Sequence, residues 1–128
     1  MTKVGIIGTG MLGEAVGLHL LNSNHTVTVF NRTKDKTEKL VDAGATLVES
    51  PKEVAENSDL VITVVRDADA VSEVAFGENG IISGKHDGMV VADMSTINPN
   101  SAKEISQKFE SSGVEFLEIP VMGGPNVA

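Results

Sequence analysis

Residues 3–13 read Lys-Val-Gly-Ile-Ile-Gly-Thr-Gly-Met-Leu-Gly and contain the clearest signal for the fold. Its apolar start, residues 3–8, stops at a glycine and is typical of a strand that is buried on both faces. Residues 11–22 follow with Leu12, Val16 and Leu20 at helical spacing, and they end at Asn22-Ser23-Asn24. The chain therefore opens with a predicted strand, a glycine-rich loop and a helix.

The same alternation of strand and helix runs through the rest of the chain. Further strands are predicted at 26–30, 45–48, 60–65, 89–92 and 115–119, and helices at 34–43, from 51, at 67–75 and at 99–111. Ser50-Pro51 and Asn98-Pro99 each combine a capping residue with proline at the first helical position. Residues 76–88 are expected to form a loop with one turn of helix, and residues 120–128 a turn. The pattern predicts an α/β fold in a single domain, 1–128, with a doubly wound, mostly parallel sheet.

Composition limits the classes of partner. Among 128 residues, 18 are acidic and 10 basic, and the net charge of −8 disfavours nucleic acid and anionic membrane surfaces. There are no cysteines, so disulfides, thiolate metal sites and thiol nucleophiles are excluded. His19, His25 and His86 lack metal-ligand spacing, so no metal site is predicted. No apolar run approaches a membrane span, and we expect a cytoplasmic protein.

The loop Gly8-Thr9-Gly10-Met11-Leu12-Gly13 fits the pattern G-x-G-x-x-G, here between a strand and a helix. In such loops the first glycine permits a tight turn, the second lets a diphosphate approach the backbone, and the third lets helix and strand pack closely. The N-terminus of the helix then offers N–H groups to the phosphates. The pattern predicts dinucleotide binding on a Rossmann-type sheet. The alternative is that the glycines serve only the turn and its packing.

The residues after the second strand indicate which dinucleotide is bound. An NAD site usually has Asp or Glu there for the ribose 2′-hydroxyl, whereas this chain has Asn31-Arg32-Thr33-Lys34 and no carboxylate before Asp35. A guanidinium at Arg32 can bind a 2′-phosphate, which a carboxylate would repel. Asn31 and Thr33 can donate further hydrogen bonds. The sequence therefore predicts NADP rather than NAD, unless Arg32 merely lies in a solvated turn.

Several motifs together resemble the amino-terminal half of the β-hydroxyacid dehydrogenase family. That family includes 3-hydroxyisobutyrate dehydrogenase, the glyoxylate/succinic semialdehyde reductases and, more distantly, 6-phosphogluconate dehydrogenase. The resemblance covers essentially the whole chain. It rests on the glycine loop, Asn31-Arg32-Thr33, Val64-Val65-Arg66-Asp67, Phe76-Gly77-Glu78-Asn79-Gly80, the segment Asp93 to Pro99 and the segment Glu118 to Gly124.

The resemblance implies roles for three loops that follow the fourth, fifth and sixth strands. The loop from Val64 to Asp67 would pass over the cofactor, with Val64, Val65 and Arg66 as its binding residues, and Thr96 would touch the nicotinamide side. The substrate would be bordered by Ser95, Met122, Gly123 and Gly124. The carboxyl ends of parallel strands are where ligands sit in such sheets, which agrees with this placement. The alternative for Ser95 and Thr96 is that they precede and cap the next helix, although Asn98 is available as the cap.

Two departures from the family pattern bear on catalysis. Met122 stands where the family has a serine that helps hold the substrate carboxylate, and a thioether donates no hydrogen bond. The resemblance also implies a catalytic lysine on a long helix well downstream, and no lysine of this chain occupies a matching motif. No catalytic residue is therefore assigned. We expect that the chain is truncated before a helical carboxyl-terminal domain. Without the lysine of that domain, we expect the chain alone to be inactive. The resemblance implies a dimer that is built largely by the helical carboxyl-terminal domain. Whether this chain forms a homo-oligomer therefore stays open.

The leading hypothesis is the cofactor-binding portion of an NADP-dependent oxidoreductase. It would transfer a hydride between the nicotinamide and a small β-hydroxy acid, or its aldehyde or keto partner. One alternative is a stand-alone NADP(H)-binding module without catalysis. Another is an imine reductase-like enzyme, because that branch also carries apolar residues near the last turn. A Rossmann methyltransferase is disfavoured, because it would usually have an acidic residue at the position of Asn31.

Overall fold

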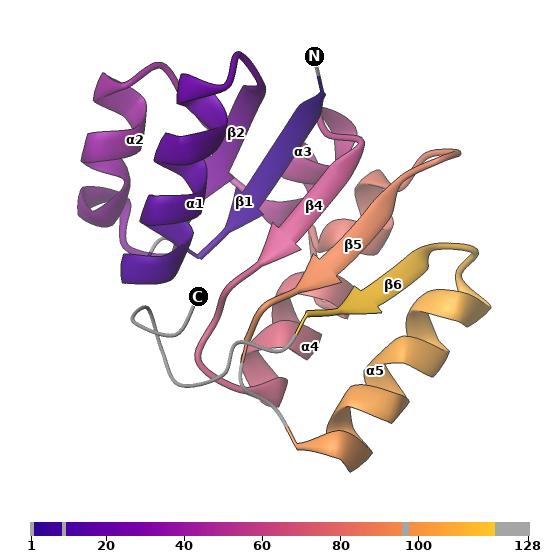
Figure 1. Cartoon of the computed structure of the whole chain (residues 1–128). Coiled ribbons are helices and arrows are strands. Elements are labelled where there is room, and N and C mark those ends of the chain that lie inside the picture. Colours follow the sequence, from indigo (N-terminus) through magenta and orange to yellow (C-terminus); the bar gives the residue numbers. More distant parts are fainter. Residues whose placement is uncertain (1, 9, 96–97, 120–128) are drawn as a thin grey trace.

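The computed structural model describes residues 2–8, 10–95 and 98–119, and these residues form one six-stranded sheet (Figure 1). The strand order is β3-β2-β1-β4-β5-β6, and every neighbouring pair is parallel. The strands are β1 (Lys3–Ile7), β2 (Thr26–Phe30), β3 (Thr46–Leu47), β4 (Leu60–Thr63), β5 (Val90–Asp93) and β6 (Glu115–Glu118). The predicted parallel α/β fold is confirmed.

The connections between the strands are helical and lie on both faces of the sheet. They are α1 (Met11–Asn22), η1 (Lys34–Thr37), α2 (Glu38–Asp42), α3 (Pro51–Glu56), α4 (Ala68–Phe76), η2 (Ile81–Gly84) and α5 (Pro99–Ser111). The predicted caps are confirmed at α3 and α5, where the side chains of Ser50 and Asn98 accept hydrogen bonds from the N–H groups of Glu53 and Ser101. In the described part of the chain, no helix is long and apolar enough to cross a membrane.

Alternating strand residues divide the core into two clusters. Val4 and Ile6 of β1 belong to the cluster that Leu40 and the apolar residues of α1 complete. Ile7 belongs to the opposite cluster, which contains buried residues of α3, α4 and α5. Because both faces of the central strands are covered, their sequences are almost continuously apolar. This explains why the sequence pattern predicted them well.

The strand order reverses between β1 and β4, which are neighbours in the sheet but far apart in the sequence (Figure 1). The chain leaves β1 toward β2 on one side, and β4 leads toward β5 on the other. In doubly wound sheets this point leaves a crevice outside the carboxyl ends of the strands. The residues that follow β1, β2 and β4 meet there.

Several predicted boundaries differ from the structure by one residue at an end, as at β1, β3, β5, α4 and β6, and two larger differences have a visible cause. The strand predicted at 60–65 ends at Thr63, because the Val65 N–H donates to the Ser95 side chain instead of a neighbouring strand. The helix predicted at 34–43 is a 3-10 turn followed by α2, and the break falls at Thr37, which is buried. The turn expected at 120–128 lies outside the described residues. That residues 1–128 form a single domain stays a prediction.

Candidate functional site

The glycine loop begins with a backbone turn that requires glycine. Gly8 has φ of +97°, in the left-handed region, and its N–H donates to the Phe30 carbonyl oxygen at 3.0 Å. A Cβ atom added to Gly8 would lie 2.0 Å from the Val64 carbonyl oxygen, and one added to Gly13 would lie 2.3 Å from the Gly8 carbonyl oxygen. The loop thus brings β1, β4 and α1 closer together than side chains would permit.

Gly10 is different, because the protein itself does not require a glycine there. It has φ of −66° and immediately precedes α1, and an added Cβ would meet nothing within 4 Å. The first N–H groups of a helix have no partner within the helix and carry a partial positive charge. The backbone beside Gly10 therefore forms an open cradle at the N-terminus of α1, of a kind that suits a phosphate group.

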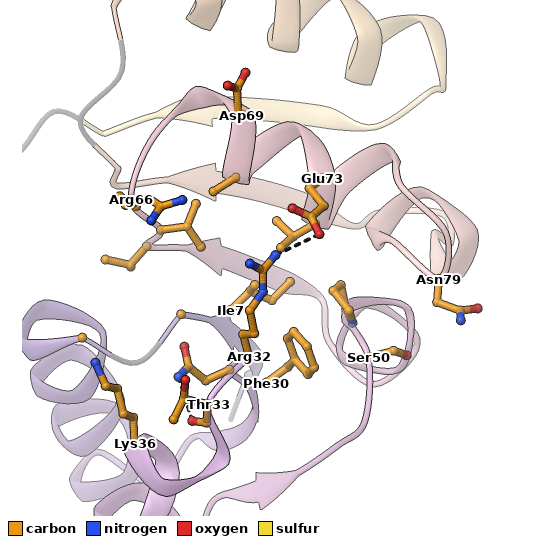
Figure 2. A pocket seen from close by; sticks show the side chains of 18 of the residues that line it. Ile7, Phe30, Arg32, Thr33, Lys36, Ser50, Arg66, Asp69, Glu73 and Asn79 are labelled. Carbon is orange, nitrogen blue, oxygen red and sulfur yellow. Dashed lines mark hydrogen bonds and ion pairs between the residues drawn. The ribbon is translucent and has the colours of Figure 1, made fainter.

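A cavity of about 870 Å³ lies at the carboxyl ends of β1, β2 and β4 (Figure 2). The sequence-predicted residues that line it are Gly8, Gly10, Asn31, Arg32, Thr33, Val64, Val65 and Arg66. Met11, Leu12, Gly13 and Ser95 are not among the lining residues. Thr9, Thr96, Met122, Gly123 and Gly124 lie outside the described residues. The structure therefore brings together three segments that are far apart in the sequence.

Arg32 leaves the end of β2 and reaches across this cavity to α4 (Figure 2). Its Nη2 atom forms an ion pair with Oε1 of Glu73 at 2.8 Å, and the two side chains are 75% and 65% exposed. Exposed pairs of this kind contribute little to stability, so the guanidinium can exchange partners at low cost. Next to it, the Asn31 amide donates to the Thr33 carbonyl oxygen at 2.8 Å and fixes the shape of the turn.

The loop after β4 is held in place by a polar network that is centred on the buried Asp93 side chain. The Val65 N–H donates to the Ser95 hydroxyl oxygen at 2.8 Å. Asp93 is fully buried, and its Oδ1 accepts from the Thr63 hydroxyl at 2.7 Å and from the Ser95 N–H at 3.2 Å. Ser95 therefore joins the loops that follow β4 and β5. Its hydroxyl positions the cavity wall that Val64, Val65 and Arg66 form.

Several further residues that line the cavity were not predicted from the sequence. They are Ile7, Phe30, Lys36, Glu49, Ser50, Pro51, Asp69, Ala70, Glu73, Val74, Glu78 and Asn79. Asp67, the last residue of the loop predicted to pass over the cofactor, also lines the cavity. Lys36 could have been found, since it follows Arg32 by four residues in a short basic stretch. Glu73 carries no local signal, because it comes to the site from another helix. Five carboxylates and three basic side chains line the cavity altogether.

The comparisons with known proteins agree with this geometry. The family model described as the NAD-binding domain of 6-phosphogluconate dehydrogenase matches residues 3–128. The chain belongs to this family. The resemblance found in the sequence is thereby confirmed, and the chain is an NAD(P)-binding domain.

Among the relatives of this NAD(P)-binding domain is a probable 3-hydroxyisobutyrate dehydrogenase-like 1 protein, mitochondrial, of Arabidopsis thaliana. It is 41% identical over 124 residues, which are 96% of this chain and 37% of that protein. An imine reductase from Myxococcus stipitatus in complex with NADP⁺ has a TM-score of 0.89 at 27% identity, over 97% of this chain and 42% of that one. The 3-hydroxyisobutyrate dehydrogenase of Mycobacterium tuberculosis has a TM-score of 0.88 at 25% identity, again over 97% and 42%. The chain spans less than half the length of these relatives.

The residues present fit the dinucleotide that this family implies. The loop from Gly8 leaves an open cradle at the N-terminus of α1, where an added Cβ on Gly10 would fill the space. Arg32 and Lys36 supply positive charge in the same cavity. Among the described residues, no group of three or more acidic or histidine side chains could hold a metal ion.

Proposed function

We propose that this chain binds NADP, with the diphosphate at the loop Gly8 to Gly13 and the 2′-phosphate at Arg32. It would serve as the cofactor-binding portion of an oxidoreductase. That enzyme would move a hydride between the nicotinamide and a small β-hydroxy acid, or its aldehyde or keto partner. The bound nicotinamide supplies the redox chemistry, and the residues of this chain hold and orient it.

The observation that carries this proposal is the position of Arg32. The guanidinium lies after β2, beside the strand that leads into the glycine loop, and it lines the same cavity as Gly8 and Gly10. Residues 31–34 contain no carboxylate that could take the ribose 2′-hydroxyl. A planar guanidinium can bind a phosphate through two N–H groups, which the Asn31 and Thr33 side chains can supplement.

The remaining predicted residues have lesser roles in this proposal. Val64, Val65 and Arg66 would cover the cofactor, and Thr96 would touch its nicotinamide side. Ser95, Met122, Gly123 and Gly124 would border the substrate. No residue of this chain matches the lysine that the family resemblance implies as general acid or base. We therefore assign to the chain the binding of the cofactor and expect no turnover from it alone.

An imine reductase-like activity is the second candidate, and Met122 favours it. A thioether in place of a hydroxyl removes one hydrogen-bond donor for a substrate carboxylate. The two candidates separate when an enzyme that contains this domain is given NADPH with succinic semialdehyde or with a cyclic imine. Oxidation of NADPH by only the aldehyde supports the first candidate, and oxidation by only the imine supports the second.

Calorimetric titration of the chain with NADPH and NADH tests the proposal. We expect NADPH to bind more tightly, and Arg32→Ala to weaken NADPH binding by about 1.5–3 kcal/mol, the value of a hydrogen bond to a charged group. NADH binding should change much less. Lys39→Ala is the matched control, because it removes an exposed positive charge outside the cavity. Equal NADPH affinity in Arg32→Ala and the unaltered chain would overturn the assignment of NADP.

A further inference from the structure

The ion pair between Arg32 and Glu73 joins two walls of the cavity that are 41 residues apart in the sequence (Figure 2). Arg32 comes from the loop after β2, and Glu73 lies on α4. Both residues line the cavity, and the atoms Nη2 and Oε1 are 2.8 Å apart. The Glu73 carboxylate is therefore paired with the same guanidinium that is proposed to bind the 2′-phosphate.

We propose that Glu73 is a specificity-determining residue, because its carboxylate competes with the 2′-phosphate of NADP for the Arg32 guanidinium. This inference rests on the proposed function. The carboxylate serves as the counter-ion of Arg32 in the chain without cofactor, and the phosphate takes its place on binding. Glu73 therefore lowers the affinity for NADPH and narrows the preference for NADPH over NADH.

Charge and exposure both support a competing role. A carboxylate and a 2′-phosphate carry charge of the same sign, so both gain from the guanidinium but repel each other. The Glu73 side chain is 65% exposed, so solvent and salt screen the pair and the phosphate can displace it. NADH has no 2′-phosphate and does not compete for the guanidinium. Removing the negative charge of Glu73 should therefore favour NADPH more than NADH.

Asp69 provides a matched control on the same helix. It lies four residues before Glu73 on α4, lines the same cavity and is also exposed. The described residues show no ion pair between Asp69 and Arg32. Asp69→Asn therefore removes the same charge from the same wall without releasing the guanidinium, and it separates competition for Arg32 from a general change in potential.

The experiment measures dissociation constants for NADPH and NADH in Glu73→Gln, Asp69→Asn and the unaltered chain. Glutamine keeps the shape of the side chain, and thermal melts of each variant check that the fold is intact. We expect Glu73→Gln to raise the affinity for NADPH about two- to fivefold, the range for one exposed ion pair. The affinity for NADH should change less. The ratio of NADPH affinity to NADH affinity should change less in Asp69→Asn than in Glu73→Gln.

Two fragments of the cofactor isolate the contact from the rest of the dinucleotide. Adenosine 2′,5′-bisphosphate should bind more tightly to Glu73→Gln than to the unaltered chain, whereas adenosine 5′-monophosphate should not. Lower affinity for NADPH in Glu73→Gln would mean that Glu73 positions Arg32, and it would overturn the inference. An unchanged ratio of NADPH to NADH affinity, or an equal effect of Asp69→Asn, would also overturn it.

The two single variants distinguish failure of this inference from failure of the proposed function, and the double variant tests whether Arg32 and Glu73 act on one contact. If Arg32→Ala alone leaves NADPH affinity unchanged, the assignment of the 2′-phosphate to Arg32 is wrong. If Arg32→Ala weakens NADPH binding but Glu73→Gln does not strengthen it, only the competition is wrong. If both are right, Glu73→Gln should have little effect once Arg32 is already alanine, because the two residues act on one contact.

Discussion

Gly8 and Val64 lie against each other at the point where the strand order reverses. A Cβ atom added to Gly8 would be 2.0 Å from the Val64 carbonyl oxygen, and the Val64 N–H donates to the Ile7 carbonyl oxygen at 2.9 Å. The loops that follow β1 and β4 are therefore packed backbone to backbone. This contact sets the shape of the crevice into which the cofactor is proposed to bind.

Substitution of Gly8 should destabilise the fold. Gly8→Ala would place a side chain at φ of +97° and against the Val64 carbonyl oxygen. We expect a loss of about 2–4 kcal/mol in the free energy of unfolding, from backbone strain together with the steric clash. Urea denaturation followed by circular dichroism measures it. A loss below about 0.5 kcal/mol, the size of an ordinary surface substitution, would contradict the role of this contact.

Substitution of Gly10 should act on binding instead of stability. A Cβ there meets nothing within 4 Å, and the backbone has a φ that alanine adopts readily. We expect Gly10→Ala to change the free energy of unfolding by less than about 1 kcal/mol, because only a helix N-cap is altered. The affinities for NADPH and NADH should both fall by roughly tenfold or more, because the methyl group blocks the diphosphate. Unchanged affinities, measured by calorimetry, would place the diphosphate elsewhere.

Ser95 should contribute to both stability and cofactor binding. Ser95→Ala removes the acceptor of the Val65 N–H and frees the loop after β4. We expect a loss of about 1–2 kcal/mol in the free energy of unfolding and weaker binding of NADPH and NADH alike. Ser111→Ala, at an exposed position at the end of α5, is the control for stability. Equal unfolding curves for Ser95→Ala and Ser111→Ala would contradict the positioning role of the hydroxyl.

His86 should give the fold a weak dependence on pH. Its Nε2 lies 2.7 Å from the Ser58 carbonyl oxygen and 3.1 Å from that of Ala55, and its Nδ1 lies 3.3 Å from that of Asp87. Only the protonated ring offers an N–H on both nitrogens. The hydrogen bond to Ser58, followed by those to Asp87 and Ala55, raises the pKa of His86 above 6.5, although desolvation opposes this shift.

A raised pKa in the folded state fixes the sign of the effect. The stabilisation by protonated His86 is fully present below pH 6.5, the pKa of this side chain in the unfolded state. It is lost as the pH rises through the higher pKa of His86 in the folded state. Because the ring is exposed, we expect a change well below about 1 kcal/mol. His86→Gln keeps a neutral hydrogen-bond donor at every pH. The midpoint of its urea denaturation should therefore lose the pH dependence that His86 causes. The same dependence in His86→Gln would contradict the assignment.

The fold could be predicted from the sequence because its signals are local. The buried strands are continuous apolar runs, and Ser50 and Asn98 with their following prolines mark the starts of two helices. The end of β4 could not be predicted, because it depends on Ser95, which is 30 residues away from Val65. The predicted helix at 34–43 likewise divides after Thr37, which is buried in the tertiary structure.

The candidate site was predictable in part for the same reason. Gly8, Gly10 and Arg32 lie within three residues of a strand end, and their position at the carboxyl ends of a parallel sheet follows from the alternation of elements. Glu73 could not be found in this way, because an acidic residue on a helix usually indicates a solvated face. Its contact with Arg32 depends on how α4 packs against the sheet.

A crystal structure of the chain with bound NADP⁺ would decide where the cofactor lies. We expect the diphosphate against the backbone from Gly8 to Gly13 and the 2′-phosphate within hydrogen-bond distance of the Arg32 guanidinium, with Glu73 no longer paired to it. A diphosphate bound away from the N-terminus of α1 would contradict the account. A 2′-phosphate left in solvent while Arg32 stays paired with Glu73 would contradict it as well.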